Sequence, residues 1–330
     1  MDFSRSLVFR LLCLWVGVLA IAYLIACLYL LLRQQYFIFK PPTVIRTTPA
    51  AFNLEYQDVW LPVSTPPGHT KSQSKIADFF PLTPDVCDLS GLNATSYHLS
   101  PIHGWWVPAT APEAPVWLFL HGNGSTIGDE VKRPFWFHQL GFSCLLIDYR
   151  GYGRSQGRFP TESSVYADVE AAWKYLTQNR QIPPSQIFVY GHSLGGALAI
   201  ELALKHPEMG GLAVEGSFTT MRSMVDHLYR QFGIFPVDWL LHQKFDSLKK
   251  VSSLSMPILL IHGTGDRLIP AQMSQSLFEA ASEPKKLLLV PEAGHHNVGE
   301  LGGESYFQAL QWVVDQAQAK IVRFAEGFLQ

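Results

Sequence analysis

The stretch IFVYGHSLGGALAIELALKH, residues 187–206, contains the features that decide the fold. Its first four residues form a continuous apolar run, as in a strand that is buried on both faces. Residues 194–206 are rich in alanine and leucine, which favour a helix. Between the two lies the GxSxG sequence Gly191-His192-Ser193-Leu194-Gly195. In this context it predicts a sharp strand-to-helix turn that holds Ser193 exposed, with small neighbours that let the backbone pack closely.

The same alternation of strand and helix continues on both sides of this unit. The short apolar runs are Val116–Leu120, Phe142–Ile147, Ile187–Tyr190, Leu212–Val214, Ile258–Ile261 and Leu287–Val290. Helical stretches lie between them, near 128–140, 161–179, 194–206, 271–282 and 304–322. This order predicts the α/β class, with a mostly parallel sheet and helices on both faces.

Two segments interrupt the regular pattern inside an expected globular domain at 55–330. Residues 64–96 are rich in Ser, Thr, Pro and Gly, and we interpret them as an insertion loop between the extended segments 55–62 and 97–107. Residues 219–254 have an irregular helical pattern. They would suit a small helical cap over the carboxyl edge of the sheet, where ligands of such sheets bind.

An apolar run stands ahead of this domain. Leu11 to Leu32 reads LLCLWVGVLAIAYLIACLYLLL, which is 22 residues without a charge. As a helix it would be about 33 Å long, enough for a hydrocarbon layer of about 30 Å. We predict a transmembrane anchor at 1–32 and a proline-containing juxtamembrane linker at 33–54. A cleaved signal peptide and a lipoprotein signal ending at Cys27 are the alternatives.

Composition and motif searches exclude several classes of function. Lys and Arg total 25 and Asp and Glu total 27, so the net charge is −2. This balance gives no support to nucleic-acid binding, which relies on positive charge. The twelve His residues are scattered, and the spacings typical of zinc sites or phosphate-binding loops do not occur. We therefore expect no metal site and no nucleic-acid partner.

A nucleophilic serine needs a base and an orienting acid, which follow it along the chain in this kind of fold. Asp266 comes just after the apolar run that ends at Ile261, and His295 and His296 come just after the run that ends at Val290. Counting from the strand end favours His295 as the base, whereas the following Asn297 favours His296. Glu215, at another strand end, is an alternative acid.

Such a serine also needs two backbone N–H groups that stabilise an oxyanion. One belongs to the residue after the nucleophile, here Leu194. The second comes from a loop after an earlier strand. His121-Gly122-Asn123-Gly124-Ser125 follows the run Val116–Leu120, so Asn123 is the candidate for the second donor.

Together these motifs resemble the alpha/beta-hydrolase superfamily. The matching sequences are HGNG at 121–124, DYRGYGRS at 148–155, GHSLGG at 191–196, HGTGDRLIP at 262–270 and AGHHN at 293–297. The segments 37–42 and 102–108 are similar to those of membrane-anchored abhydrolase-domain serine hydrolases, which include protein depalmitoylases and bacterial relatives. The resemblance implies a triad of Ser193, Asp266 and His295, oxyanion donors Asn123 and Leu194, no cofactor, and ester or thioester substrates. Members usually carry one His before Asn, and here there are two.

The sequence thus predicts a membrane-anchored serine hydrolase that forms an acyl-enzyme. Its expected substrates are acyl esters, thioesters or lipid-like molecules, because an anchor would keep the site near the bilayer. An aminopeptidase-like hydrolase is one alternative, since related folds cleave amino-terminal residues. A catalytically inactive binding protein on the same fold is the other, and it would carry a damaged triad.

Overall fold

The protein, seen here as a computed structural model, is described for residues 2–65 and 98–327. Its centre is an eight-stranded sheet with the order β1-β4-β6-β5-β7-β8-β9-β10. β4 pairs antiparallel with β1 and β6, and the pairs from β6 to β10 are parallel. The predicted mostly parallel sheet is therefore confirmed. Its strands are β1 (Gln57–Leu61), β4 (Ile102–Val107), β5 (Val116–Leu120), β6 (Ser143–Ile147), β7 (Ile187–His192), β8 (Gly211–Glu215), β9 (Ile258–Gly263) and β10 (Lys285–Val290).

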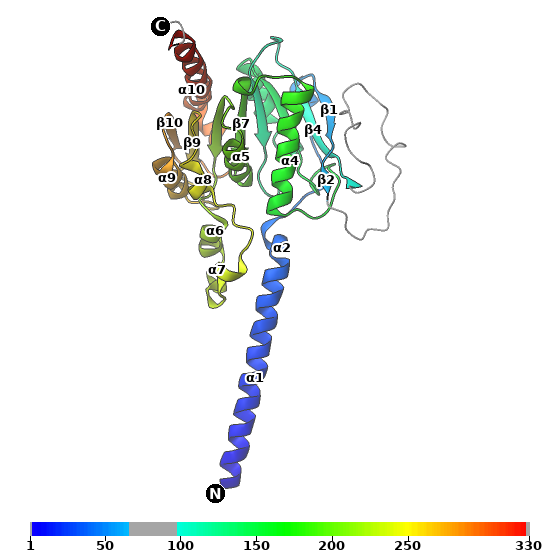
Figure 1. Cartoon of the computed structure of the whole chain (residues 1–330), viewed down its shortest axis with the longest axis vertical. Coiled ribbons are helices and arrows are strands. Elements are labelled where there is room, and N and C mark those ends of the chain that lie inside the picture. Colours follow the sequence, from blue (N-terminus) through cyan, green and yellow to red (C-terminus); the bar gives the residue numbers. More distant parts are fainter. Residues whose placement is uncertain (1, 66–97, 328–330) are drawn as a thin grey trace.

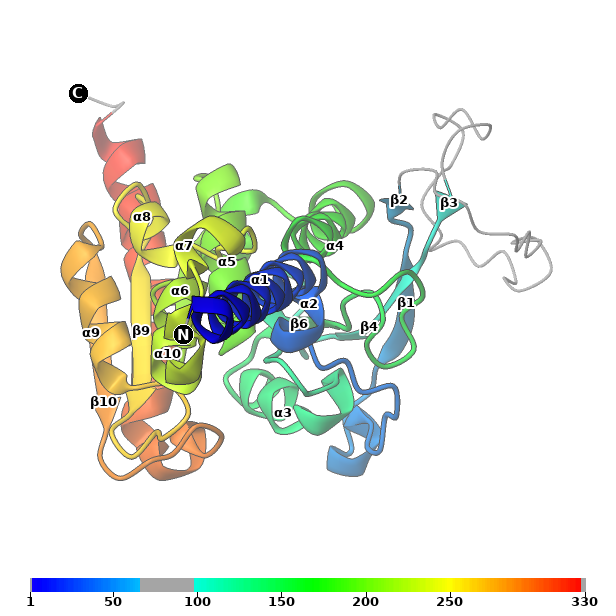
Figure 2. The same cartoon turned by 90° about the horizontal axis from the view of Figure 1, so that it is seen from below.

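Helices cover both faces of the sheet, as the α/β prediction requires (Figures 1 and 2). Successive side chains of a strand point to opposite faces, so Leu118 joins one hydrophobic core and Trp117 the other. α4, α5, α8 and α9 contribute to the first core, and α3 and α10 contribute to the second. The bounds are α3 (Lys132–Gln139), α4 (Glu162–Lys174), α5 (Leu194–Lys205), α8 (Ser247–Val251), α9 (Ala271–Ala280) and α10 (Val298–Gly327).

A long helix precedes the domain and projects from it (Figure 1). α1 (Asp2–Arg33) is followed by the short α2 (Gln35–Ile38). Residues Leu7–Arg33 are long and apolar enough to cross a membrane, by length and composition. A signal sequence near the N-terminus meets the same criteria of length and composition. The expected linker 33–54 thus begins helically, and it also contains a 3-10 turn at Pro49–Phe52.

Two short helices lie beyond the carboxyl edge of the sheet, on the same side as α1 (Figure 1). They are α6 (Met221–Leu228) and α7 (Val237–Leu240), joined by a 3-10 turn at Arg230–Ile234. We call residues 221–241 the cap. The expected cap at 219–254 also included α8. In the structure α8 packs against α5 and α9 on one face of the sheet and is not part of the cap.

The expected insertion at 64–96 falls almost wholly outside the described residues. Its first two residues form β2 (Ser64–Thr65), which pairs with β3 (His98–Leu99) in a separate ribbon.

Candidate active site

Ser193 occupies the turn between β7 and α5. Its backbone has φ 54° and ψ −117°, a sparsely populated conformation that costs on the order of 1–3 kcal/mol. The surroundings enforce it. A Cβ on Gly191 would lie 2.2 Å from the carbonyl oxygen of Gly195, and one on Gly195 would lie 2.0 Å from that of Leu120. These glycines let the helix approach the sheet, and the turn presents Ser193 at the sheet edge.

Asp266 and His295 meet at the same edge, from the loops after β9 and β10. The Nδ1 atom of His295 lies 2.6 Å from Oδ2 of Asp266. The other carboxylate oxygen accepts the backbone N–H groups of Leu268 and Ile269, at 2.8 and 2.9 Å. Burial acts to raise the pKa of Asp266, but hydrogen bonds from His262 and His295 outweigh it and lower that pKa well below its ordinary value. Asp266 is therefore an ionised acceptor that fixes the orientation of the His295 ring.

Ser193 and His295 lie on either side of the turn that follows β8. The N–H of Ser193 donates to the carbonyl of Glu215 at 2.8 Å. The next residue, Gly216, has its Cβ position 3.5 Å from the His295 ring and 3.8 Å from Asp266. Within the described residues the Ser193 hydroxyl makes no hydrogen bond, and such contacts often tighten only when substrate is bound. The structure therefore brings Ser193, His295 and Asp266 into one neighbourhood.

His296, the alternative base, lies next to this group but has different partners. Its ring packs edge-on against His295, with centroids 4.8 Å apart, and lies 5.5 Å from the His192 ring. Burial, together with the proximity of His295, lowers the pKa of His296. Of the two rings, the one bonded to Asp266 is that of His295.

Glu215, the alternative acid, belongs to a different set of contacts. Its carboxylate is fully buried and accepts Nη1 of Arg133 at 2.9 Å and the hydroxyl of Tyr190. Burial acts to raise the pKa of Glu215, but the nearby Arg133 charge outweighs burial, so the pKa of Glu215 is lowered overall. Arg133 also bonds the hydroxyl of Tyr306. This network lies beneath the turn that carries Ser193, and it holds β8 to α3 and α10.

Sequence reasoning did not anticipate Arg133 or the role of His192. Arg133 stands in the segment KRPFW, which reads as an exposed helix. His192 is buried, and its Nε2 lies 2.9 Å from the carbonyl oxygen of His295. Burial lowers the pKa of His192 to about 3, so the ring is neutral and can donate one hydrogen bond. It ties the loop of His295 to the residue before Ser193.

The predicted oxyanion donors lie at the same place. Leu194 is the first residue of α5, whose first N–H groups have no partner within the helix. Asn123 follows β5, and its side chain holds the start of the linker to the site. Its Nδ2 donates to the carbonyl of Ile38 at 2.6 Å, and its Oδ1 accepts the N–H of Lys40 at 2.9 Å. In the described ranges, the backbone N–H groups of Leu194 and Asn123 donate no hydrogen bond.

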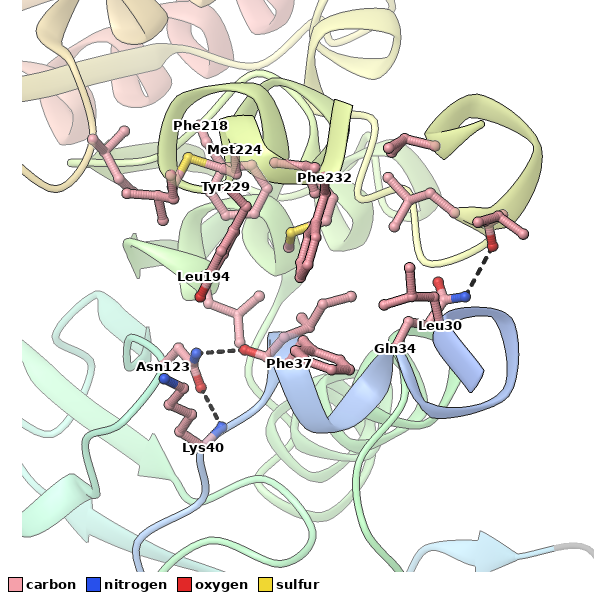
Figure 3. A pocket seen from close by; sticks show the side chains of 18 of the residues that line it. Leu30, Gln34, Phe37, Lys40, Asn123, Leu194, Phe218, Met224, Tyr229 and Phe232 are labelled. Carbon is pink, nitrogen blue, oxygen red and sulfur yellow. Dashed lines mark hydrogen bonds between the residues drawn. The ribbon is translucent and has the colours of Figure 1, made fainter. Parts of the chain in front are cut away.

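A cavity of about 340 Å³ adjoins Ser193. Leu194 and Asn123 line it beside Ser193 (Figure 3), and α1, α2 and the cap supply most of the remaining wall. Lys40, Phe218, Leu268 and Ile269 also line it. Most lining side chains are apolar, and they include Leu30, Phe37, Phe218, Met221, Met224, Val225, Leu228, Phe232, Phe235 and Leu240. No Asp or Glu is among its lining residues in the part of the chain that the structure describes.

Comparisons with known proteins agree with the fold. Human alpha/beta hydrolase domain-containing protein 17B is 30% identical over 298 residues, covering 80% of this chain and 98% of its own length. An uncharacterized protein of Mycobacterium tuberculosis is 34% identical over 209 residues, covering 63% of this chain and 73% of its own. The structure of the Pyrococcus furiosus esterase Pf2001 superimposes with a TM-score of 0.61, at 19% identity, over 83% of this chain and 95% of that one.

The family comparison covers the half of the chain that holds the site. The sequence profile of the prolyl oligopeptidase family matches residues 130–320. That range includes Ser193, Asp266 and His295. The resemblance noted from the motifs is thus confirmed: the chain belongs to the prolyl oligopeptidase family, within the alpha/beta-hydrolase superfamily.

Proposed function

We propose that this alpha/beta hydrolase is a membrane-anchored serine hydrolase that cleaves carboxylic esters or thioesters. The observation that carries the proposal is the 2.6 Å contact between His295 and Asp266, placed beside a strained Ser193 that borders an apolar cavity. An oriented imidazole next to such a serine is the arrangement that nucleophilic acyl transfer requires.

The proposed reaction has two halves. The Oγ of Ser193 attacks the acyl carbonyl while Nε2 of His295 takes the hydroxyl proton, and Asp266 stabilises the imidazolium through Nδ1. The N–H groups of Leu194 and Asn123 bind the oxyanion. His295 returns the proton to the departing alcohol or thiol, which leaves an acyl-Ser193 ester. Water then attacks that ester while His295 takes a proton from the water. The carboxylic acid departs as His295 returns the proton to Oγ of Ser193.

The anchor in this proposal is α1. Its apolar residues face outward along most of the helix, since only 6% of the most apolar 18-residue stretch within Leu7–Arg33 is buried in the protein. Such a surface is stable in hydrocarbon and costly in water. The expected result is that the chain stays with membranes after alkaline carbonate washing and is released only by detergent. Release by carbonate would contradict anchoring by α1.

A peptidase is the second candidate, because the matching family is named for an oligopeptidase. An aminopeptidase needs an anion to hold the amino group of its substrate. The cavity beside Ser193 offers Lys40 and no carboxylate among its described lining residues. This lining favours neutral acyl groups over a peptide amino terminus.

Turnover of matched substrates separates the two functions. The detergent-solubilised chain and Ser193→Ala would be given nitrophenyl esters and thioesters of increasing chain length, beside aminoacyl nitroanilides. We expect ester or thioester turnover that disappears in Ser193→Ala, with little anilide turnover. Anilide turnover that exceeds ester turnover would favour the peptidase. No turnover of either class by folded protein would favour an inactive binding protein.

A further inference from the structure

The cap is attached to the apolar helix α1 at several levels. Just after the end of α1, Gln34 donates from Nε2 to the carbonyl of Leu240 at 3.0 Å. Its Oε1 also accepts the N–H of Gln243, just beyond the cap, at 3.0 Å. Further down the helix, the hydroxyl of Tyr23 donates to the carbonyl of Ile234 at 3.0 Å. The Tyr23 ring also stacks on Phe235, with centroids 5.5 Å apart.

These contacts place part of the cap beside the membrane-crossing length of α1. Arg33 ends the apolar stretch, and its guanidinium lies 5.4 Å from the centroid of the Tyr36 ring. Arg and Tyr together are typical of the lipid headgroup level. Tyr23 is ten residues earlier, which is about 15 Å down the helix axis. The turn that contains Ile234 and Phe235 therefore lies below the headgroup level, alongside the hydrocarbon part of the helix.

The surface of the cap suits that depth. Trp239 is 91% exposed and Ile234 is 72% exposed, although both are large and apolar. Of the charges near them, Asp238 is paired, because its carboxylate accepts Nε of Arg222 at 2.6 Å. Arg230, in the turn that contains Ile234, is exposed and has no ion pair among the described residues. Exposed apolar side chains next to a membrane helix are stabilised by hydrocarbon, and the pairing of Asp238 limits the cost of approaching it.

The cavity beside Ser193 ends at the same place. Leu30, within the apolar run of α1, lines the cavity on the side opposite Leu194 and Asn123 (Figure 3), and Leu194 is the residue after Ser193. Between them the walls are Phe37 from α2 and Phe232 from the cap, whose rings meet edge-on at 6.1 Å (Figure 3). The membrane helix is thus itself part of the cavity wall.

We propose that the cap inserts into the same lipid leaflet as α1, and that the cavity between them takes the fatty chain of an acyl ester or thioester from that leaflet. The carbonyl then reaches Ser193 while the chain stays in apolar surroundings. This inference rests on the proposed hydrolase function for its substrate. The insertion of the cap can be measured without any turnover.

Fluorescence quenching tests the insertion. The full chain would be reconstituted in phosphatidylcholine vesicles that carry bromine on the acyl chains near the headgroup. The emission of a single tryptophan is obtained by subtracting the emission of the variant in which that tryptophan is replaced by Phe from the emission of the parent. We expect the Trp239 signal to be about twofold weaker than in unbrominated vesicles, in keeping with a depth of 5–10 Å. Trp15, within α1, should also be quenched, and Trp312, on α10, should not. Unquenched Trp239 beside quenched Trp15 would overturn the insertion.

Chain-length profiles test the cavity. The Leu30→Trp substitution narrows its α1 end, and Leu28→Trp is the matched control because Leu28 is exposed on the same helix and does not line the cavity. For Leu30→Trp we expect the ratio of long-chain to acetyl ester turnover to fall about tenfold, the effect of excluding roughly two methylene groups. An unchanged ratio, or an equal fall in both variants, would overturn the cavity assignment.

Charge placed on the cap tests the supply of substrate from the leaflet. We expect Ile234→Asp with Trp239→Asp to lower turnover of a vesicle-embedded long-chain ester, relative to a soluble acetyl ester, by about tenfold or more. Leu204→Asp is the control, since Leu204 is 40% exposed and lies about 16 Å along α5 from Ser193. The same fall in Leu204→Asp, or no change in the cap variant, would contradict this inference.

The two levels of proposal fail in different ways. If no ester is hydrolysed but Trp239 is quenched, the hydrolase function fails and the insertion stands. If esters are hydrolysed while Trp239 is unquenched and chain preference is unaffected by Leu30→Trp, the function stands and the present inference fails.

Discussion

The sheet edge on one side of Ser193 and the cap with α1 on the other differ in how their residues are held. At the edge, buried polar groups have directional partners: Asp266 with His295, and Glu215 with Arg133. Across the cavity, the contacts are mainly apolar packing, as between Phe37 and Phe232. Hydrogen bonds fix angles and distances, whereas apolar packing is non-directional. The edge is therefore suited to chemistry and the cap to holding a variable chain.

The largest effect is expected from removing the proposed general base of the site, His295. His295→Ala should lower kcat/KM for esters by about 10⁴-fold, because the activated form of the nucleophile is lost. His296→Ala should leave kcat/KM within about tenfold. Steady-state turnover of both variants, with circular dichroism to verify folding, makes this test. A larger loss in His296→Ala than in His295→Ala would reverse the assignment of the base.

The second effect concerns the stability of the edge. Arg133→Met leaves the buried Glu215 charge unpaired, which should lower the free energy of unfolding by about 3–5 kcal/mol. The neighbouring Lys132 pairs with Glu300 on the surface, its side chain 58% exposed, so Lys132→Met should cost no more than about 1 kcal/mol. Urea unfolding in detergent measures both. Equal losses would mean that the Glu215 pair does not stabilise the edge.

A third effect is expected where the two regions meet. Asn123 joins the loop after β5 to Ile38 and Lys40, and its N–H is a proposed oxyanion donor. Removing these exposed hydrogen bonds costs about 1–1.5 kcal/mol in positioning, so Asn123→Ala should lower kcat about five- to tenfold. Gln308→Ala, which removes an exposed hydrogen bond to Glu304, is the control. If kcat is the same in both variants, the hydrogen bonds of Asn123 to Ile38 and Lys40 do not position the site.

The smallest effect is a dependence of stability on pH that comes from His192. Burial lowers its pKa from 6.5 to about 3 in the folded chain, and the unfolded chain regains the ordinary value. Between these values the unfolded state binds more protons, so this stability is complete above about pH 6.5 and is lost as pH falls. From about pH 7 to about pH 5.5, the parent should lose about 1 kcal/mol more than His192→Gln. Parallel slopes in urea titrations would contradict this account.

The sheet edge could be predicted largely from the sequence, because its motifs are local. Buried strands are continuous apolar runs, and GxSxG between a run and a helix marks the turn at Ser193. The boundaries of β10, the outermost strand on one side of the sheet, were less predictable. β10 begins at Lys285, two residues before the apolar run, and its residues are mostly half-buried. An edge strand tolerates charged side chains that a central strand does not.

The partners across the structure could not be predicted. Nothing in KRPFW indicates that Arg133 is buried against Glu215, 82 residues away. Similarly, the apolar run of α1 predicts a membrane helix but not the contact of Tyr23 with Ile234, 211 residues away. Apolar packing and ion pairing at such separations depend on the completed fold, and local propensity does not encode them.

The most direct test of the central claim is to map a long-chain alkyl fluorophosphonate on the full-length chain in detergent. The reagent forms a stable adduct with an activated serine, and its chain should occupy the cavity between the cap and α1. We predict one adduct, on Ser193, formed faster than with an ethyl fluorophosphonate and absent in Ser193→Ala. An adduct on another residue, or none on folded protein, would contradict Ser193 as the nucleophile.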